Sequence, residues 1–85
     1  MYRVMIVEDD EIIAKTVKKH LEQWQYDVHI ISDLSNVMGE FTDYSPHIVL
    51  MDIKLPFYNG YHWCSEIRRV SKLPIMLLSS ASDNM

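Results

Sequence analysis

Acidic and hydroxyl side chains directly follow three short apolar runs of this 85-residue chain. In chain order they are Glu8 and Asp9 after residues 4–7, Asp52 after residues 48–51, and Ser79 after residues 75–78. If these runs are neighbouring parallel strands about 4.8 Å apart, the carboxylates at their ends converge. Converging carboxylates repel each other unless a hard divalent cation bridges them or one of them holds a proton.

The chemistry favoured by such a cluster is magnesium-assisted phosphoryl transfer. Mg²⁺ prefers oxygen ligands, keeps several waters, and binds through one or two carboxylates together with a phosphate. The cation neutralises charge on a transferring phosphoryl group. An aspartate held beside it could attack phosphorus and form an acyl phosphate, while the Ser79 hydroxyl could donate to a phosphoryl oxygen.

The apolar runs themselves indicate the strands that would position these groups. Residues 4–7, 48–51 and 75–78 show no helical period and each run stops at a polar residue, which favours strands buried on both faces. Residues 28–31 form a shorter and weaker run, typical of an outer strand.

The intervening segments carry apolar residues at helical spacing. Three stripes are expected: Ile13, Val17, Leu21 and Trp24; Leu34, Val37, Met38 and Phe41, with Asp33 as the N-cap; and Trp63, Ile67 and Val70, beginning after Asn59-Gly60. Both tryptophans are interpreted as packing residues.

Alternation of strands and helices with short connections predicts an α/β fold with an open, doubly wound parallel sheet and right-handed crossovers. In such sheets ligands bind at the carboxyl ends of the strands. The acids and the hydroxyl described above are predicted to lie at that edge.

Other classes of site are disfavoured. The first turn lacks the glycines of dinucleotide-binding and P-loop motifs, and the four histidines have no metal-ligand spacing. A net charge of −4 disfavours direct nucleic-acid binding. No apolar run approaches the roughly 20 residues of a membrane span, and a single cysteine suits a reducing cytoplasm.

Four motifs together resemble the receiver domain of bacterial two-component response regulators. They are Val7-Glu8-Asp9-Asp10, Met51-Asp52-Ile53-Lys54-Leu55-Pro56, Asn59-Gly60 and Leu78-Ser79-Ser80. They occur in the family's order and cover nearly the whole chain. The resemblance implies a flavodoxin-like (CheY-like), three-layer αβα fold with strand order 2-1-3-4-5.

The same resemblance implies a role for each site residue. Asp52 would be the phosphoacceptor, receiving its phosphoryl group from a histidine of a sensor kinase. Asp9 would bind Mg²⁺ directly together with Asp52, and Glu8 would act mostly through water. The backbone carbonyl of Lys54 would be a further ligand, and Ser79 would be the switch hydroxyl. The domain would act as a signalling switch, not a metabolic enzyme.

Residues outside these four motifs resemble one subgroup of these regulators. Glu22-Gln23-Trp24 and Tyr61-His62-Trp63-Cys64 look like Gram-positive regulators that respond to antimicrobial peptides or bacitracin. That likeness implies a cytoplasmic protein that controls transcription.

The family pattern continues beyond Met85, so residues 1–85 are expected to form a partial receiver domain. The last strand, its lysine, the flanking helices and a DNA-binding effector domain would be absent from this chain. DNA would then be contacted only through that effector domain. Residues 74–78 would form an exposed apolar edge, so self-association, for example as a homodimer, is expected.

Three alternatives stay open at this point. A pseudo-receiver would keep the fold and bind a partner without phosphorylation, and a small Mg²⁺-dependent phosphohydrolase would need a substrate pocket. More simply, Glu8 to Glu11 could be a solvated turn that favours a helix N-terminus, Asp52 an ordinary turn acid, and Ser79 a helix cap.

Overall fold

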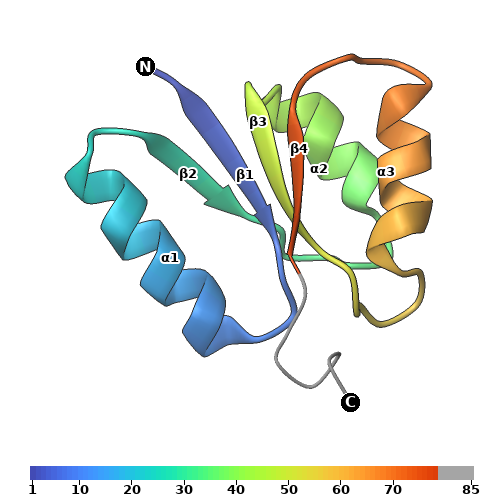
Figure 1. Cartoon of the computed structure of the whole chain (residues 1–85), viewed down its shortest axis with the longest axis horizontal. Helices are drawn as coiled ribbons and strands as arrows, with labels where there is room; N and C mark the ends of the chain where they lie inside the picture. The colour runs from blue at the N-terminus through green and yellow to red at the C-terminus, as the bar shows by residue number, and fades with distance from the viewer. Residues whose placement is uncertain (79–85) are drawn as a thin grey trace.

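A computed structural model describes residues 1–78 of the chain and shows strands alternating with helices (Figure 1). The elements are β1 (Arg3–Val7), α1 (Glu11–Gln23), β2 (Asp27–Ile30), α2 (Val37–Tyr44), β3 (Ile48–Asp52), α3 (Gly60–Arg68) and β4 (Ile75–Leu78). The predicted order of elements is confirmed.

The four strands form one parallel sheet in the order β2-β1-β3-β4. Strand β1 is one of the two inner strands, and its residues Val4 to Val7 are at most 3% exposed. The uninterrupted apolar run is therefore explained, since both faces of this strand are covered.

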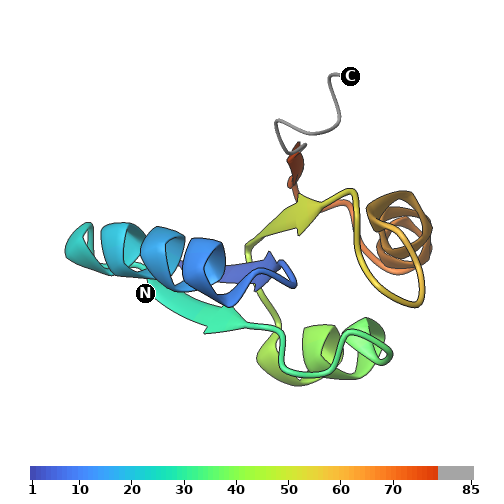
Figure 2. The same cartoon turned by 90° about the horizontal axis from the view of Figure 1, so that it is seen from below.

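Helices cover the two faces of the sheet, as Figures 1 and 2 show. Alternate residues of β1 divide between two cores: Val4 and Ile6 pack with Ala14 of α1, whereas Met5 and Val7 pack with residues of α2 and α3. The predicted three-layer doubly wound α/β architecture is confirmed.

The apolar stripe predicted for α1 is partly wrong. Ala14 is the buried residue of this helix, while Ile13 is 45% exposed and Trp24, at the C-cap, is 77% exposed. Trp24 is therefore not a packing residue. Trp63 on α3 is only 5% exposed, as its stripe predicted.

The start of α2 also differs from the expectation. Asn36, not Asp33, is the N-cap, and its Oδ1 accepts a hydrogen bond of 3.3 Å from the amide of Gly39. Asp33 instead accepts from the amide of Ser35 in the preceding turn. Both residue types favour caps and turns, so their side chains alone do not fix where the helix begins.

Helix α3 begins at Gly60 after the predicted Asn59-Gly60 pair, and the Asn59 side chain accepts from the amide of His62 at 2.9 Å. The helix ends at Arg68, so Val70 lies beyond it and is 69% exposed, against the prediction. No helix within residues 1–78 is long and apolar enough to cross a membrane.

Phe57, in the loop between β3 and α3, has a positive φ of 69° and is 73% exposed. A left-handed conformation costs a side-chain-bearing residue roughly 1–2 kcal/mol. Phe57→Gly is therefore expected to raise the free energy of unfolding by about 0.5–1 kcal/mol, measured by urea denaturation. Phe57→Ala, which keeps the Cβ, is the control, and a glycine variant no more stable than it would contradict this account.

Candidate functional site

Three acids meet at the carboxyl ends of the central strands. Carboxylate oxygens of Glu8, Asp9 and Asp52 all lie within 4.8 Å of one another. Val7 is paired with Met51, so Glu8 and Asp52 follow in the same register and project to the same side of the sheet. The sequence prediction that acids after β1 and β3 converge is thus matched by the geometry.

The remaining acids of the first turn serve the helix. Oδ1 of Asp10 accepts hydrogen bonds from the amides of Ile12 (3.0 Å) and Ile13 (3.2 Å), which makes Asp10 the N-cap of α1. Glu11 lies in the first turn, where a negative charge favours the helix dipole. The solvated-turn interpretation therefore holds for Asp10 and Glu11 but does not account for Glu8 and Asp9.

Burial and the neighbouring carboxylates raise the pKa of Glu8 to about 8. Desolvation is the largest cause, followed by the hydrogen bond to Asp52 and the negative charge of that residue. Glu8 Oε2 accepts hydrogen bonds from the amides of Asp9 and Asp10 at 3.0 and 3.5 Å. The bond from the Asp10 amide lowers the pKa, whereas the hydrogen bond to the Asp9 side chain raises it, so the net shift stays upward. A proton on Glu8 thus relieves the repulsion within the cluster.

The same repulsion is what a divalent cation would relieve. Asp52, at 7% exposure, is the buried acid of the cluster. Glu8 is half-buried and Asp9 is exposed, so the cluster is accessible to solvent from the side of Asp9. All its ligand atoms are carboxylate oxygens, the type that Mg²⁺ prefers. The residues present therefore fit a hard divalent cation with water in its open positions.

Gly60 packs closely against the backbone of Asp52, the buried acid of the cluster. Its amide donates to the carbonyl of Ile53 at 2.8 Å, and a Cβ on Gly60 would lie 2.3 Å from the backbone oxygen of Asp52. The sequence pattern pointed to this glycine only as part of the Asn59-Gly60 pair. The structure shows that the first turn of α3 presses directly on the backbone of Asp52.

The described geometry does not test the roles of two further predicted site residues. Lys54 lies in the loop two residues after β3 and is exposed; its role as a carbonyl ligand stays a prediction. Ser79 lies outside the described residues, so its role as a switch hydroxyl also stays a prediction.

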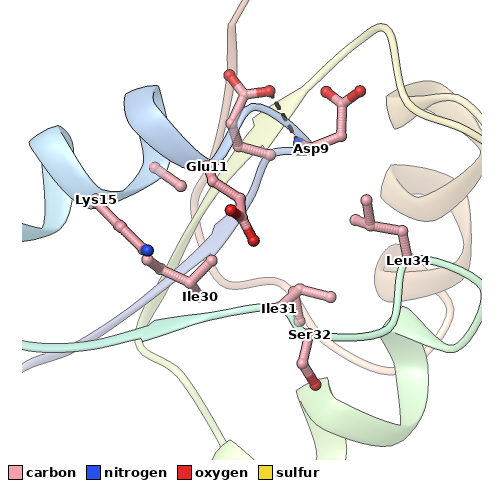
Figure 3. Close-up of a pocket in the computed structure, with 9 residues that line it drawn as sticks. Asp9, Glu11, Lys15, Ile30, Ile31, Ser32 and Leu34 are labelled. Atoms are coloured by element: carbon pink, nitrogen blue, oxygen red, sulfur yellow. Dashed lines mark hydrogen bonds between the residues drawn. The ribbon is translucent and has the colours of Figure 1, made fainter.

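A hollow of about 360 Å³ opens beside the acids. Glu8, Asp9, Glu11 and Lys15 line one side, and the end of β2 with the turn after it lines the other, through Ile30, Ile31, Ser32 and Leu34. Figure 3 shows Asp9 and Ser32 on opposite sides of this hollow. The open side of the cluster therefore leads into a space large enough for a small molecule or a partner's side chain.

Comparison with known proteins gives a consistent result. The family model described as "Response regulator receiver domain" matches residues 4–85. The chain is 44% identical over 80 residues to the sensory transduction protein BceR of Halalkalibacterium halodurans, covering 94% of this chain and 35% of that protein. It is 42% identical over 83 residues to the response regulator protein GraR of Staphylococcus aureus, covering 98% and 37%.

A solved structure agrees with these relatives. The N-terminal domain of the nisin resistance regulator NsrR, a lantibiotic response regulator, superposes with a TM-score of 0.90 at 38% identity, covering all of this chain and 72% of that one. The predicted likeness to regulators of the antimicrobial-peptide subgroup is thus confirmed.

The chain spans about a third of the length of the curated relatives it matches, 35–37% for the two named above. The matched family model nevertheless covers nearly all of this chain, and the sheet order and the position of the acids agree with it. The chain therefore belongs to the response regulator receiver domain family.

Proposed function

We propose that this domain receives a phosphoryl group on Asp52 from a histidine of a sensor kinase, with Mg²⁺ bound beside it. The observation that carries the proposal is the convergence of Glu8, Asp9 and Asp52 within 4.8 Å at the carboxyl ends of β1 and β3. That geometry favours a phosphoacceptor over a pseudo-receiver, because a domain that only bound a partner would have no need of three repelling carboxylates.

Each residue has a defined task in the proposed reaction. Asp9 and Asp52 bind Mg²⁺ directly, Glu8 acts through water, and the Lys54 carbonyl supplies a further oxygen. The N–P bond of the phosphohistidine breaks, its electron pair returns to the ring nitrogen, and a carboxylate oxygen of Asp52 forms the new bond to phosphorus. Ser79 then donates its hydroxyl to a phosphoryl oxygen.

The output proposed for this switch is control of transcription in the cytoplasm. GraR is named as a response regulator and NsrR as a nisin resistance regulator, which supports an antimicrobial peptide as the stimulus here too. A DNA-binding effector domain outside this chain would carry the output. Self-association through the β4 edge, where Met76 is 54% exposed, is part of the same proposal.

Phosphorylation of the protein at its native length tests the proposal. With Mg²⁺ and acetyl phosphate, mass spectrometry should detect one phosphoryl group on Asp52, and chelation of Mg²⁺ or the Asp52→Asn substitution should abolish it. Glu66→Gln, which removes an acid of α3 outside the cluster, should leave the adduct unchanged. A wild-type protein that takes up no phosphoryl group from acetyl phosphate or a kinase would instead support the pseudo-receiver.

A further inference from the structure

The carboxylate of Glu40, on α2, gathers hydrogen bonds from β2 and from the turn that follows it. Oε1 is 2.8 Å from Nε2 of His29. The amide of Ser32 donates to both carboxylate oxygens at 3.0 and 3.1 Å. The Ser32 hydroxyl donates to Oε2 at 3.1 Å, and the amide of Asp33 at 2.7 Å. One side chain thus fixes the path of the chain between β2 and α2.

Glu40 makes these bonds as a carboxylate. Burial alone would raise its pKa, but hydrogen bonds from the Ser32 amide, from His29 and from the Asp33 amide outweigh that effect and lower the pKa. Hydrogen bonds to an ionised acceptor are short and strong, so the turn is held firmly at neutral pH.

The turn that Glu40 holds is also a wall of the hollow beside the acid cluster. Ser32 lines that hollow, which begins at Glu8 and Asp9, and it also lines a second hollow formed with His29, Glu40 and Tyr44. Figure 3 shows Ile31 and Leu34 beside the space below Asp9, whereas the Ser32 side chain points away from it. Glu40 therefore lies behind the wall, without reaching the acids itself.

We propose that Glu40 is a positioning residue for phosphoryl transfer, because it holds the β2–α2 turn as the fixed wall against which the phosphoryl donor binds. This inference rests on the function proposed above. With an acyl phosphate, the P–O bond to the acyl carboxylate breaks, the acyl carboxylate leaves with the electron pair, and Asp52 forms the new P–O bond without proton transfer. The departing acyl group would occupy the hollow that the turn encloses.

Without the hydrogen bonds to Glu40, the β2–α2 turn has to be ordered each time a donor binds. Donor binding is then weaker, while the chemistry at Asp52 is unchanged. Glu40→Ala is therefore expected to raise the KM for acetyl phosphate about tenfold and to leave kcat within about twofold. A purely structural loss would act differently: a smaller folded fraction lowers the phosphorylated yield and the apparent kcat, but not KM.

The experiment measures the initial rate of phosphorylation against acetyl phosphate concentration, with saturating Mg²⁺ and the protein at its native length. Glu40→Gln should restore a KM close to that of wild type, since its oxygen can accept from the turn and its amide can donate to His29. Asp43→Ala is the matched control, because Asp43 lines the second hollow on the same helix. Its KM should equal that of wild type.

Each result has a distinct meaning. A tenfold rise in KM for Glu40→Ala, with rescue by Glu40→Gln, supports the positioning role. Equal KM values in wild type and Glu40→Ala, or a change confined to kcat, overturn that role and leave the proposed function standing. Failure of the wild-type protein to accept a phosphoryl group at all overturns the proposed function, and the positioning role with it.

Discussion

Gly60→Ala is expected to lower the free energy of unfolding by about 2–3 kcal/mol, because the new methyl group meets rigid backbone. The Cβ would lie 2.3 Å from the backbone oxygen of Asp52 and 3.0 Å from the Cα of Ile53. Neither atom belongs to a flexible side chain, so α3 or the end of β3 has to move. Urea denaturation measures the loss, and calorimetric titration should show weaker Mg²⁺ binding.

Gly39→Ala is the matched control for that substitution. A Cβ on Gly39 would come within 2.5 Å of Nδ2 of Asn36, the end of a side chain that can rotate away. Alanine also favours the interior of α2 by about 1 kcal/mol over glycine, which offsets the weakened cap. If the two variants lost the same stability, close packing of α3 on Asp52 could not be the reason for Gly60.

Mg²⁺ binding is expected to tighten about tenfold between pH 6 and pH 7, because the cation displaces the proton held by Glu8. The pKa of Glu8 is raised to about 8, so this proton is present throughout that interval in the metal-free protein. Isothermal titration calorimetry in two buffers of different ionisation enthalpy would measure both the affinity and the protons released.

The metal-free protein should show the opposite trend in stability. The raised pKa of Glu8 means that the folded state holds a proton that the unfolded chain loses near pH 4.5. Stability from this group is complete below pH 4.5 and is lost as pH rises towards 8. Chemical denaturation at a series of pH values, without divalent cations, measures this slope.

Glu8→Gln separates these effects from other titrating groups. It should flatten both pH dependences and weaken Mg²⁺ binding at pH 8, where about half of the wild-type carboxylate is already ionised in the metal-free protein. Glu11→Gln, which alters an acid outside the three-residue cluster, should leave both dependences as they are in wild type. Retention of the wild-type slopes in Glu8→Gln would show that another group holds the proton.

The fold and the acid cluster could be predicted from sequence because both follow from strand ends. Parallel strands with uninterrupted apolar runs must be buried on both faces, and their carboxyl ends must share one edge. Glu8, Asp9 and Asp52 directly follow or end such runs, so their meeting needed no knowledge of side-chain positions. The family motifs then added specific roles that spacing alone could not supply.

Contacts between distant segments could not be predicted in the same way. Asp33 was expected to cap α2, but Asn36 is the N-cap, because the start of the helix depends on where Val37 enters the core. The exposure of Trp24 depends on α1 ending at Gln23, one residue short of the stripe. The link from Glu40 to Ser32 joins residues without any shared motif, and only the folded chain brings them together.

The contrast between the two indole rings gives the molecule an optical readout of its acid site. Trp24 is 77% exposed at the end of α1, whereas Trp63 is 5% exposed and lies three residues after the glycine that presses on Asp52. Iodide in solution is expected to reach the first ring and to be excluded from the second. Trp24→Phe would therefore leave a single, shielded indole, whose emission would report any change around α3 when the carboxylates bind a ligand.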